Sequence, residues 1–296
     1  MALLNPPELR ASVILSIVRF IGAQRAQQDR LERILDSLAP ASLDGTDPQR
    51  DVRENLFAAI ELGVLVQSDG KIGLADGMRS AMKEEPNAPV KFLRESVLAN
   101  RLNSAPWTSQ AGARDLTNAL SWFLTFSPSE SPTKMENAPR SAHALQTRDF
   151  GPRQDNDEAS NWPIGNGNRW NTFRRWACSL GFAWVGPNGN IVPDPTVAVR
   201  DTLPNIFESA IELTADDFVD KVGAHLPVLD RGRYREFVIQ NWKRPAVEVR
   251  GITAPLTEAI DRLSTEGVIL VDDRADAARV VKSDGSTFSH VRIGGR

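Results

Sequence analysis

Two segments of this chain repeat one local pattern, an amphipathic helix that ends at a glycine and leads into a short hairpin. Residues 62–65 read Leu-Gly-Val-Leu and precede Gly-Lys-Ile at 70–72, while residues 180–183 read Leu-Gly-Phe-Ala and precede Gly-Asn-Ile at 189–191. A looser third copy occupies residues 263–270. Glycine supplies the left-handed backbone that ends a helix. This order is how a winged-helix domain ends, so we expect a mainly α chain with small β wings (α+β), built from tandem winged-helix domains.

The repeats divide the 296 residues into three predicted units. We expect an N-terminal winged helix at 1–78, a middle winged helix at 88–200 and a C-terminal winged-helix-like domain at 205–296. The middle unit contains an insertion at 127–166 that is rich in Ser, Pro, Asn and Asp. A loop of this length inside a domain is uncommon, so the insertion is expected to be functional or poorly ordered.

Apolar periodicity and capping residues place the individual elements. Asp29 is predicted to cap the second helix and Thr214 a later one, and a hairpin is expected at 64–74. The polar stretch after Asp76 indicates a boundary, and residues 193–204 indicate a connector. The other expected helices lie at 9–24, 48–62, 90–102, 112–126, 168–180, 231–242 and from 254 onward.

Composition narrows the class of protein. The net charge of −3 and the pI of about 5.8 argue against non-specific coating of nucleic acid, although they allow a local basic face. A single cysteine, Cys178, excludes an internal disulfide framework and a thiolate metal cluster. No apolar stretch reaches the ~18 residues that a membrane span requires. We therefore expect a soluble cytoplasmic protein that does not contact a membrane.

The helix predicted at 168–180 carries the strongest candidate for a binding face. It occupies the recognition position of a winged helix, and Asn and Arg are the side chains that bond bidentately to adenine and guanine edges. Arg169 and Arg174 flank the apolar stripe and could meet phosphates. A solvated helix face in an acidic protein is the competing interpretation. The residues predicted to share the outward, DNA-contacting face are Asn168, Asn171, Thr172, Arg175 and Ser179.

Secondary contacts with phosphates or with a partner protein are predicted elsewhere. Arg53 and Lys71 belong to the first unit, where acidic neighbours on the same helix make DNA binding less favourable. The densest basic cluster is either a phosphate or partner patch or a solvated helix end, and it comprises Arg231, Arg233, Arg235, Lys243 and Arg244. The last helix is expected to turn an acidic face outward and to contact protein; its outward residues are Thr257, Glu258, Asp261, Arg262 and Thr265.

Catalytic patterns are weak in this sequence. The three histidines lack metal-ligand spacing, and the glycines at 165–168 lack the Gly-Lys-Ser/Thr of a phosphate-binding loop. Cys178 is expected to be a buried structural thiol, and Asp272-Asp273 an exposed turn. We therefore expect no catalytic residue, no metal site and no cofactor, and a protein that is not an enzyme.

Short motifs resemble one known family. They are Leu-Leu-Asn-Pro-Pro at 3–7, Arg-Trp-Ala at 175–177 before Leu-Gly-Phe at 180–182, and Ile-Val-Pro-Asp-Pro-Thr at 191–196. Together they resemble DpdG, an accessory protein of bacterial gene clusters that insert 7-deazaguanine derivatives into DNA and restrict unmodified DNA. The resemblance implies an anti-phage setting and helicase or ATPase partners from the same cluster. It brings no catalytic residues with it.

The sequence thus favours a non-enzymatic accessory protein that binds double-stranded DNA through the 168–180 helix and recruits helicase, ATPase or other defence proteins. Two alternatives stay open at this stage. One is a purely structural winged-helix adaptor for a large ATPase or helicase complex, which the acidic charge favours. The other is a transcriptional regulator, although no heptad pattern indicates a dimerisation element. The oligomeric state is left open.

Overall fold

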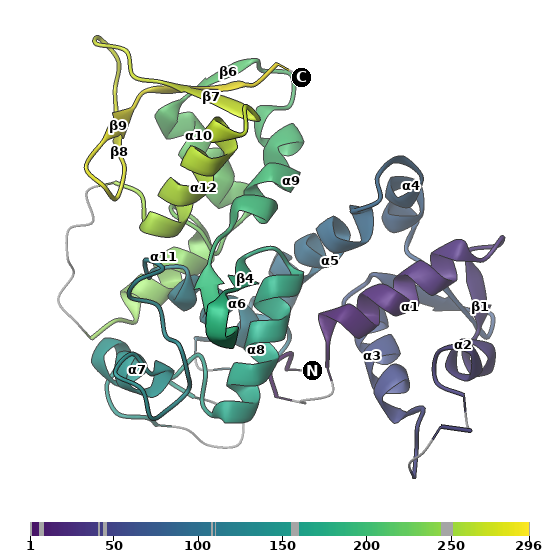
Figure 1. Ribbon diagram of the computed structural model, residues 1–296. Helices are drawn as coiled ribbons and strands as arrows, with labels where there is room; N and C mark the ends of the chain where they lie inside the picture. The colour runs from purple at the N-terminus through teal and green to yellow at the C-terminus, as the bar shows by residue number, and fades with distance from the viewer. Residues whose placement is uncertain are drawn as a thin grey trace.

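The computed structural model describes residues 2–5, 9–40, 42–43, 46–107, 109, 111–154, 160–243 and 251–295. It is a mixed α+β molecule in which small antiparallel sheets lie among many short helices. Figure 1 shows the N-terminal unit on one side, with α4 above α1 and α5 between this unit and the rest of the molecule.

The N-terminal unit packs three helices against a three-stranded sheet with strand order β1-β3-β2. Ile14 and Ile17 of the first helix meet Leu56 and Ile72 in a fully buried core. Asp29 is not the cap of α2, because the N-cap is Arg30 and Asp29 is part of β1. The elements are α1 (Ala11–Ala23), β1 (Gln28–Arg30), α2 (Leu31–Leu38), α3 (Arg50–Glu61), β2 (Leu65–Ser68) and β3 (Lys71–Leu74).

The polar stretch after Asp76, expected to be a boundary, is a helix. α4 (Asp76–Glu84) buries Met78 and leads into α5 (Ala88–Leu98) and the 3-10 turn η1 (Asn100–Leu102). Because α4 packs by one narrow side against α5, most of its residues face solvent and the sequence there is polar.

The middle unit is organised around α6 (Arg114–Phe123), a helix whose every residue is buried. The 127–166 insertion is packed where it is described: Trp122 Nε1 donates to Asp149 at 2.9 Å, and Gln146 Nε2 donates to the Ile164 carbonyl at 2.9 Å. The remaining elements are α7 (Ala142–Phe150), α8 (Gly167–Ser179), β4 (Ala183–Val185), the turn η2 (Pro187–Gly189) and β5 (Ile191–Pro193).

The C-terminal unit repeats the strand order of the N-terminal one, as β6-β10-β7. Residues 193–204 are not a connector, since 196–207 form α9, which buries Val199 and Ile206 and carries Pro204 within it. The domain boundary predicted between 200 and 205 therefore falls inside a helix. Thr214 does cap α10, accepting from the Asp217 N–H at 3.1 Å.

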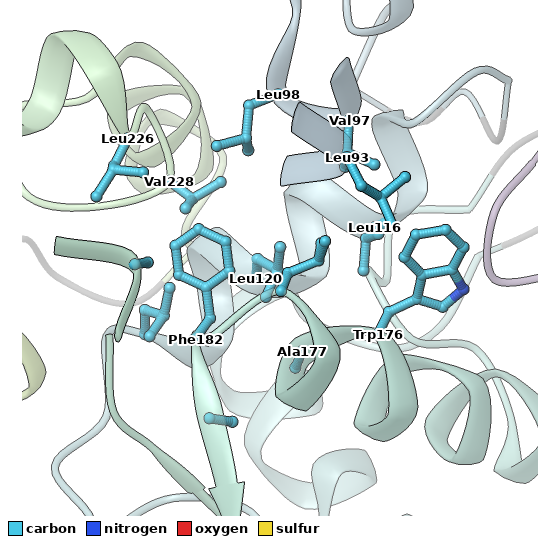
Figure 2. Close-up of a cluster of buried hydrophobic side chains, with 14 of the residues drawn as sticks. Leu93, Val97, Leu98, Leu116, Leu120, Trp176, Ala177, Phe182, Leu226 and Val228 are labelled. Atoms are coloured by element: carbon cyan, nitrogen blue, oxygen red, sulfur yellow. The ribbon is translucent and has the colours of Figure 1, made fainter. Parts of the chain in front are cut away.

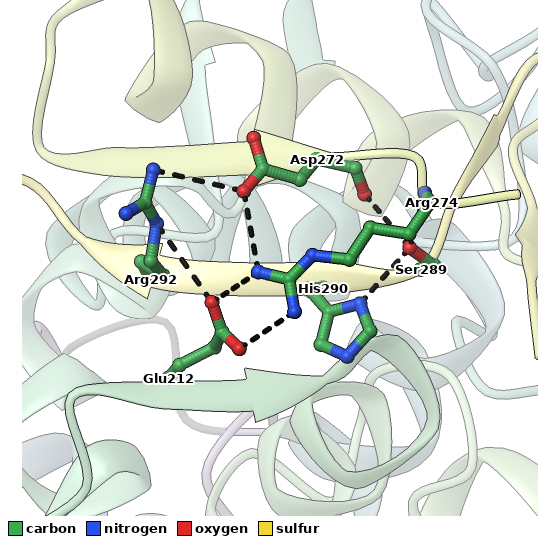
Figure 3. A network of polar contacts seen from close by, with 6 residues as sticks. All are labelled: Glu212, Asp272, Arg274, Ser289, His290 and Arg292. Atoms are coloured by element: carbon green, nitrogen blue, oxygen red, sulfur yellow. Dashed lines mark hydrogen bonds and ion pairs between the residues drawn. The ribbon is translucent and has the colours of Figure 1, made fainter. Parts of the chain in front are cut away.

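The elements of this unit follow one another along the chain with α11 and a second hairpin inserted. They are α9 (Thr196–Phe207), β6 (Glu212–Thr214), α10 (Ala215–His225), α11 (Arg233–Gln240), α12 (Ala254–Thr265), β7 (Ile269–Asp272), β8 (Val280–Val281), β9 (Thr287–Phe288) and β10 (His290–Ile293). On the outer face of the sheet, Arg274 and Arg292 bridge Glu212 and Asp272 (Figure 3). These ion pairs are exposed and hold the strands together only weakly.

One hydrophobic core runs through the units. Figure 2 shows Leu93 and Val97 of α5 on the same side of the cluster as Leu116 of α6 and Trp176 of α8, and Phe182 pointing toward Val228 of the C-terminal unit. Trp176 Nε1 also donates to the Leu9 carbonyl at 3.2 Å. α8 is therefore held from several directions, and its orientation is set by the core.

Candidate nucleic-acid interface

Three helices end in the same way and then enter a hairpin. Gly63, Gly181 and Gly267 follow α3, α8 and α12, with φ of 75°, 76° and 71°. In each case the residue after the glycine donates its N–H to the carbonyl five residues before it, as in a Schellman cap. These bonds are Val64 to Ala59 (3.0 Å), Phe182 to Ala177 (2.9 Å) and Val268 to Leu263 (2.9 Å).

The same residue after the glycine also closes each hairpin. Its carbonyl accepts an N–H from the residue that follows the second hairpin strand. The bonds are Ala75 to Val64 (3.2 Å), Asp194 to Phe182 (3.0 Å) and Gly294 to Val268 (2.9 Å). The helix–glycine–hairpin pattern is confirmed at all three places, so each helix meets its hairpin through the same backbone geometry.

The solvent side of α8 presents part of the predicted face. Asn168, Asn171 and Arg175 are exposed, and Ser179 is half-buried. Asn166 caps the helix by accepting from the Arg169 N–H at 3.0 Å, so the helix starts at Gly167, one residue before the predicted start at 168. These outward residues lie on successive turns and form a strip along the helix.

Thr172 and Arg169 do not belong to that strip. Thr172 exposes 1% of its surface and donates its hydroxyl to the Asn168 carbonyl, and Arg169 exposes 5% and faces the buried carboxylate of Asp115. The prediction of an outward Thr172 and a phosphate-contacting Arg169 was wrong. Both α1 and α6 pack on α8, so its buried arc is wider than the single stripe that periodicity indicated.

Arg174 is fastened to the hairpin that follows α8. Its guanidinium donates to the Gly189 carbonyl at the tip. Between helix and hairpin lies a groove of about 230 Å³, lined by Asn171, Arg174, Arg175, Cys178, Val185 and Ile191. Sequence reasoning missed Val185 and Ile191, although the alternation of the hairpin strands could have placed them toward the helix.

The electrostatics of this region are one-sided. From residue 160 to residue 193 the chain has three arginines and no Asp or Glu. In the described part of the chain, neither Arg174 nor Arg175 forms an ion pair with a carboxylate. The positive charges of these two guanidinium groups are therefore not neutralised by a described carboxylate, and an anion could bind them. Burial raises the pKa of the nearby Cys178 thiol, so that thiol stays protonated near neutral pH.

The secondary candidates in the first unit are differently placed. Arg53 pairs with Asp47 at 3.0 Å, and Arg50 pairs with Glu54 at 2.9 Å. Lys71 is exposed at the edge of the hairpin, directly across from Arg30 on β1. The cationic groups of α3 are thus largely neutralised by carboxylates of the same unit.

The basic cluster after α10 does not form one patch. Arg231 pairs with Asp216 and Asp220, and Arg233 donates to the Tyr234 hydroxyl at 3.0 Å. Arg235 is buried and donates to the Ser121 carbonyl, so its predicted role as an exposed contact was wrong. Lys243 is exposed beside α7, and Arg244 lies outside the described residues.

The outward face predicted for the last helix is largely occupied. Thr257 is buried and accepts from the Ser283 N–H at 3.0 Å, which corrects its assignment as outward. Arg262 pairs with Asp194, Glu266 with Arg200 and Asp261 with Lys282. The charged side chains at α12 therefore mostly form ion pairs with α9, with the end of the middle hairpin and with the β8–β9 hairpin.

Asp115 is a buried acid that sequence reasoning missed. Its carboxylate accepts the backbone N–H groups of Leu3 at 3.1 Å, Leu4 at 2.7 Å and Leu116 at 2.8 Å. Burial raises its pKa to about 6 against the pull of these bonds and of Arg169. It anchors the start of the chain to α6, and no sequence pattern announces such a long-range contact.

Arg94 joins the end of α8 to α9. Its guanidinium donates to the Leu180 carbonyl at 2.6 Å and to Asp201 at 2.9 Å, and burial lowers its pKa. Arg101 contacts the end of α3 similarly, donating to the Leu62 carbonyl and to the Glu61 carbonyl at 3.2 Å. Each arginine supplies a cation to a helix C-terminus next to the glycine cap.

A family model described as DpdG-like matches residues 1–277. The chain belongs to the DpdG-like family. The match covers the first two helix–glycine–hairpin segments and the third as far as β7, and it confirms the resemblance indicated by the short motifs. Neither a curated protein nor a solved structure gives a significant match to this DpdG-like chain.

Among the residues that the structure describes, no group of three or more His, Cys, Asp or Glu side chains is arranged to hold a metal ion. No helix in the described ranges is long and apolar enough to cross a membrane.

Proposed function

We propose that this protein is a non-catalytic accessory subunit that binds double-stranded DNA through α8 and its hairpin. Family membership points to a component of a 7-deazaguanine DNA-modification system, for which DNA is the shared substrate. The observation that carries the proposal is that Asn171 and Arg175 of the strip, with Arg174 next to them, lie beside a hairpin in a segment without carboxylates.

The architecture supports winged-helix units as the scaffold for this contact. The N-terminal unit runs helix, strand, helix, helix, strand, strand, and the C-terminal unit keeps that order with α11 and the β8–β9 hairpin inserted. Both sheets place the last strand in the middle, as β1-β3-β2 and β6-β10-β7. We infer that the middle unit is a reduced member of this set, in which β4 and β5 form the wing.

The chemistry of the strip suits duplex DNA. Asn171 and Arg175 are one turn apart on the exposed side of α8, so both side chains reach the same groove, and Asn and Arg bond bidentately to adenine and guanine edges. Arg174, which donates to the Gly189 carbonyl at the hairpin tip, would contact a phosphate of the flanking strand. Helix and hairpin would then contact base edges and backbone together.

The experiment is a salt titration of duplex binding for the wild type and for Asn171→Ala/Arg175→Ala. We expect at least 10-fold weaker binding of the double variant and a salt slope reduced by about one, because one phosphate or base contact per arginine is lost. Arg279→Ala is the matched control, since Arg279 directly precedes β8 in the C-terminal unit and pairs with Asp273. Equal affinity and slope for wild type and double variant would remove α8 as the DNA contact.

A second candidate function is a structural adaptor for an ATPase or helicase of the same system. The net charge of −3 favours protein contacts over DNA contacts, and the ion pairs within the chain leave few charges of α12 for a phosphate backbone. Co-purification of the full chain with a large ATPase, combined with no retention on DNA cellulose, would support the adaptor over the DNA-binding subunit.

A further inference from the structure

Trp184 is unusually exposed for a tryptophan beside a binding face. It exposes 43% of its surface on β4, whereas Trp162, Trp170 and Trp176 of the same unit expose 4% or less. It lies across from Val192 on β5, in the hairpin that follows α8. A large aromatic ring left in water at this position gains by covering its face with another flat, apolar group.

The ring borders a hollow that continues the α8 strip. This hollow has a volume of about 390 Å³ and is lined by Cys178 and Ser179 of α8, by Trp184, and by Val197 at the start of α9. Cys178 also lines the groove that holds Asn171 and Arg175, so the two spaces adjoin along the helix. The volume lies within the range of about 300–1,000 Å³ typical of small-ligand sites.

The charges around the hollow are balanced. Three carboxylates line it, and each is paired: Asp194 with Arg262, Asp201 with Arg94, and Glu266 with Arg200. Because these charges are paired, the lining is suited to an uncharged ring. Arg174 and Arg175, which form no ion pair with a described carboxylate and could bind a phosphate, lie on the adjoining part of α8. A neutral hollow next to two arginines fits a nucleotide whose base enters the hollow and whose phosphates contact the arginines.

We propose that Trp184 stacks on an unpaired base of DNA at a junction between duplex and single strand. The inference rests on the proposed DNA binding by α8 and names the kind of DNA that this site prefers. Cationic side chains along the backbone and an aromatic platform for the bases are the two parts of sites that bind single-stranded DNA. One stacked base corresponds to roughly a 10-fold gain in affinity.

The test compares a blunt duplex with the same duplex carrying a short single-stranded overhang, in fluorescence anisotropy with the full chain. We expect the wild type to bind the overhang DNA about 10-fold more tightly, Trp184→Ala to lose this preference while binding the blunt duplex as before, and Trp184→Phe to keep part of it. 2-Aminopurine in the overhang should be quenched by the wild type and not by Trp184→Ala. Ile211→Ala is the control, because Ile211 is an apolar residue that is 77% exposed and lines neither the hollow nor the groove.

Failure of the wild type to bind either DNA contradicts the proposed function and this inference with it. Binding of the blunt duplex without any preference for the overhang, or with a preference that Trp184→Ala retains, overturns the stacking role of Trp184 alone and leaves a partner protein's side chain as the occupant to test. Asn171→Ala/Arg175→Ala is expected to weaken both DNAs alike, which separates the strip from the hollow.

Discussion

α3 and α8 end in the same glycine cap and the same hairpin closure, yet their surroundings differ in charge. From residue 50 to residue 74 the chain has three basic and four acidic residues, and the α3 arginines are paired with acids. From residue 160 to residue 193 it has three arginines and no acid. The backbone geometry of a helix–hairpin unit therefore determines where a binding face can lie, and the surrounding charges determine whether that face can bind an anion.

The largest difference should appear at the two arginines that hold the ends of these helices. Arg94 is 2% exposed and pairs with Asp201, which is 10% exposed. Arg94→Ala leaves that carboxylate and the Leu180 carbonyl without their donor, so we expect a loss of about 3–5 kcal/mol in the free energy of unfolding. Arg101→Ala, at an exposed site, should cost under about 1 kcal/mol. Urea denaturation of both variants measures the contrast, and equal losses would contradict it.

The two buried anchors of the N-terminal segment should differ in their response to pH. Asp115 binds the Leu3 and Leu4 N–H groups as a carboxylate, whereas Asn55 accepts from the Arg10 N–H at 2.8 Å as an uncharged amide. The pKa of Asp115 is raised from 3.8 to about 6, so the folded state binds its proton more tightly than the unfolded state. Its favourable contribution is complete below pH 3.8 and is lost as the pH rises through 6.

Relative to Asp115→Asn, the wild type should therefore lose up to about 3 kcal/mol of unfolding free energy between pH 4 and pH 7, as follows from the raised pKa. Chemical denaturation at several pH values gives this difference directly. Asn55→Ala is the control, because a lost amide shifts stability by the same amount at every pH. Parallel curves for wild type and Asp115→Asn would show that Asp115 does not titrate in this range.

Replacing each of the three cap glycines by alanine should lower stability by an amount that depends on the atoms that the new methyl group contacts. A Cβ at Gly181 would lie 3.0 Å from Val197 Cγ1, a stiff side chain, and one at Gly63 would lie 2.7 Å from the flexible Arg101 guanidinium. At Gly267 nothing lies within 4 Å, so alanine there meets only the left-handed backbone cost of about 1–2 kcal/mol. We expect the loss of stability to fall in the order Gly181→Ala, Gly63→Ala, Gly267→Ala. Melting temperatures of the three variants check this order. If Gly267→Ala showed the largest decrease, the predicted order would be wrong.

The smallest expected contrast concerns DNA affinity at single arginines. Arg175→Ala should weaken duplex binding by about 1–2 kcal/mol, since it removes an unpaired cation from the α8 strip. Arg53→Ala should change it by less than twofold, because Asp47 already neutralises Arg53. Anisotropy titrations at one salt concentration compare them. A larger effect at Arg53 would move the DNA contact from α8 to α3.

The sequence by itself determined the local units of this protein. Glycine at 63, 181 and 267 ends each helix because only a residue without a Cβ adopts φ near +75° at little cost, and the alternation after it forms the hairpins. Thr214 and the absence of carboxylates from 160 to 193 were likewise visible in the chain. Such features depend on neighbours within a few residues, so the sequence states them directly.

Only the tertiary structure decided which faces are covered. Thr172 and Arg169 are buried because α1 and α6, distant in sequence, close over both sides of α8. The helix at 196–207 was hidden by Pro195 directly before it and Pro204 within it, and packing against α10 and α12 stabilises it. Asp115 and Arg94 act on backbone more than eighty residues away. Contacts over such distances arise from how helices pack, and no local pattern of residues encodes them.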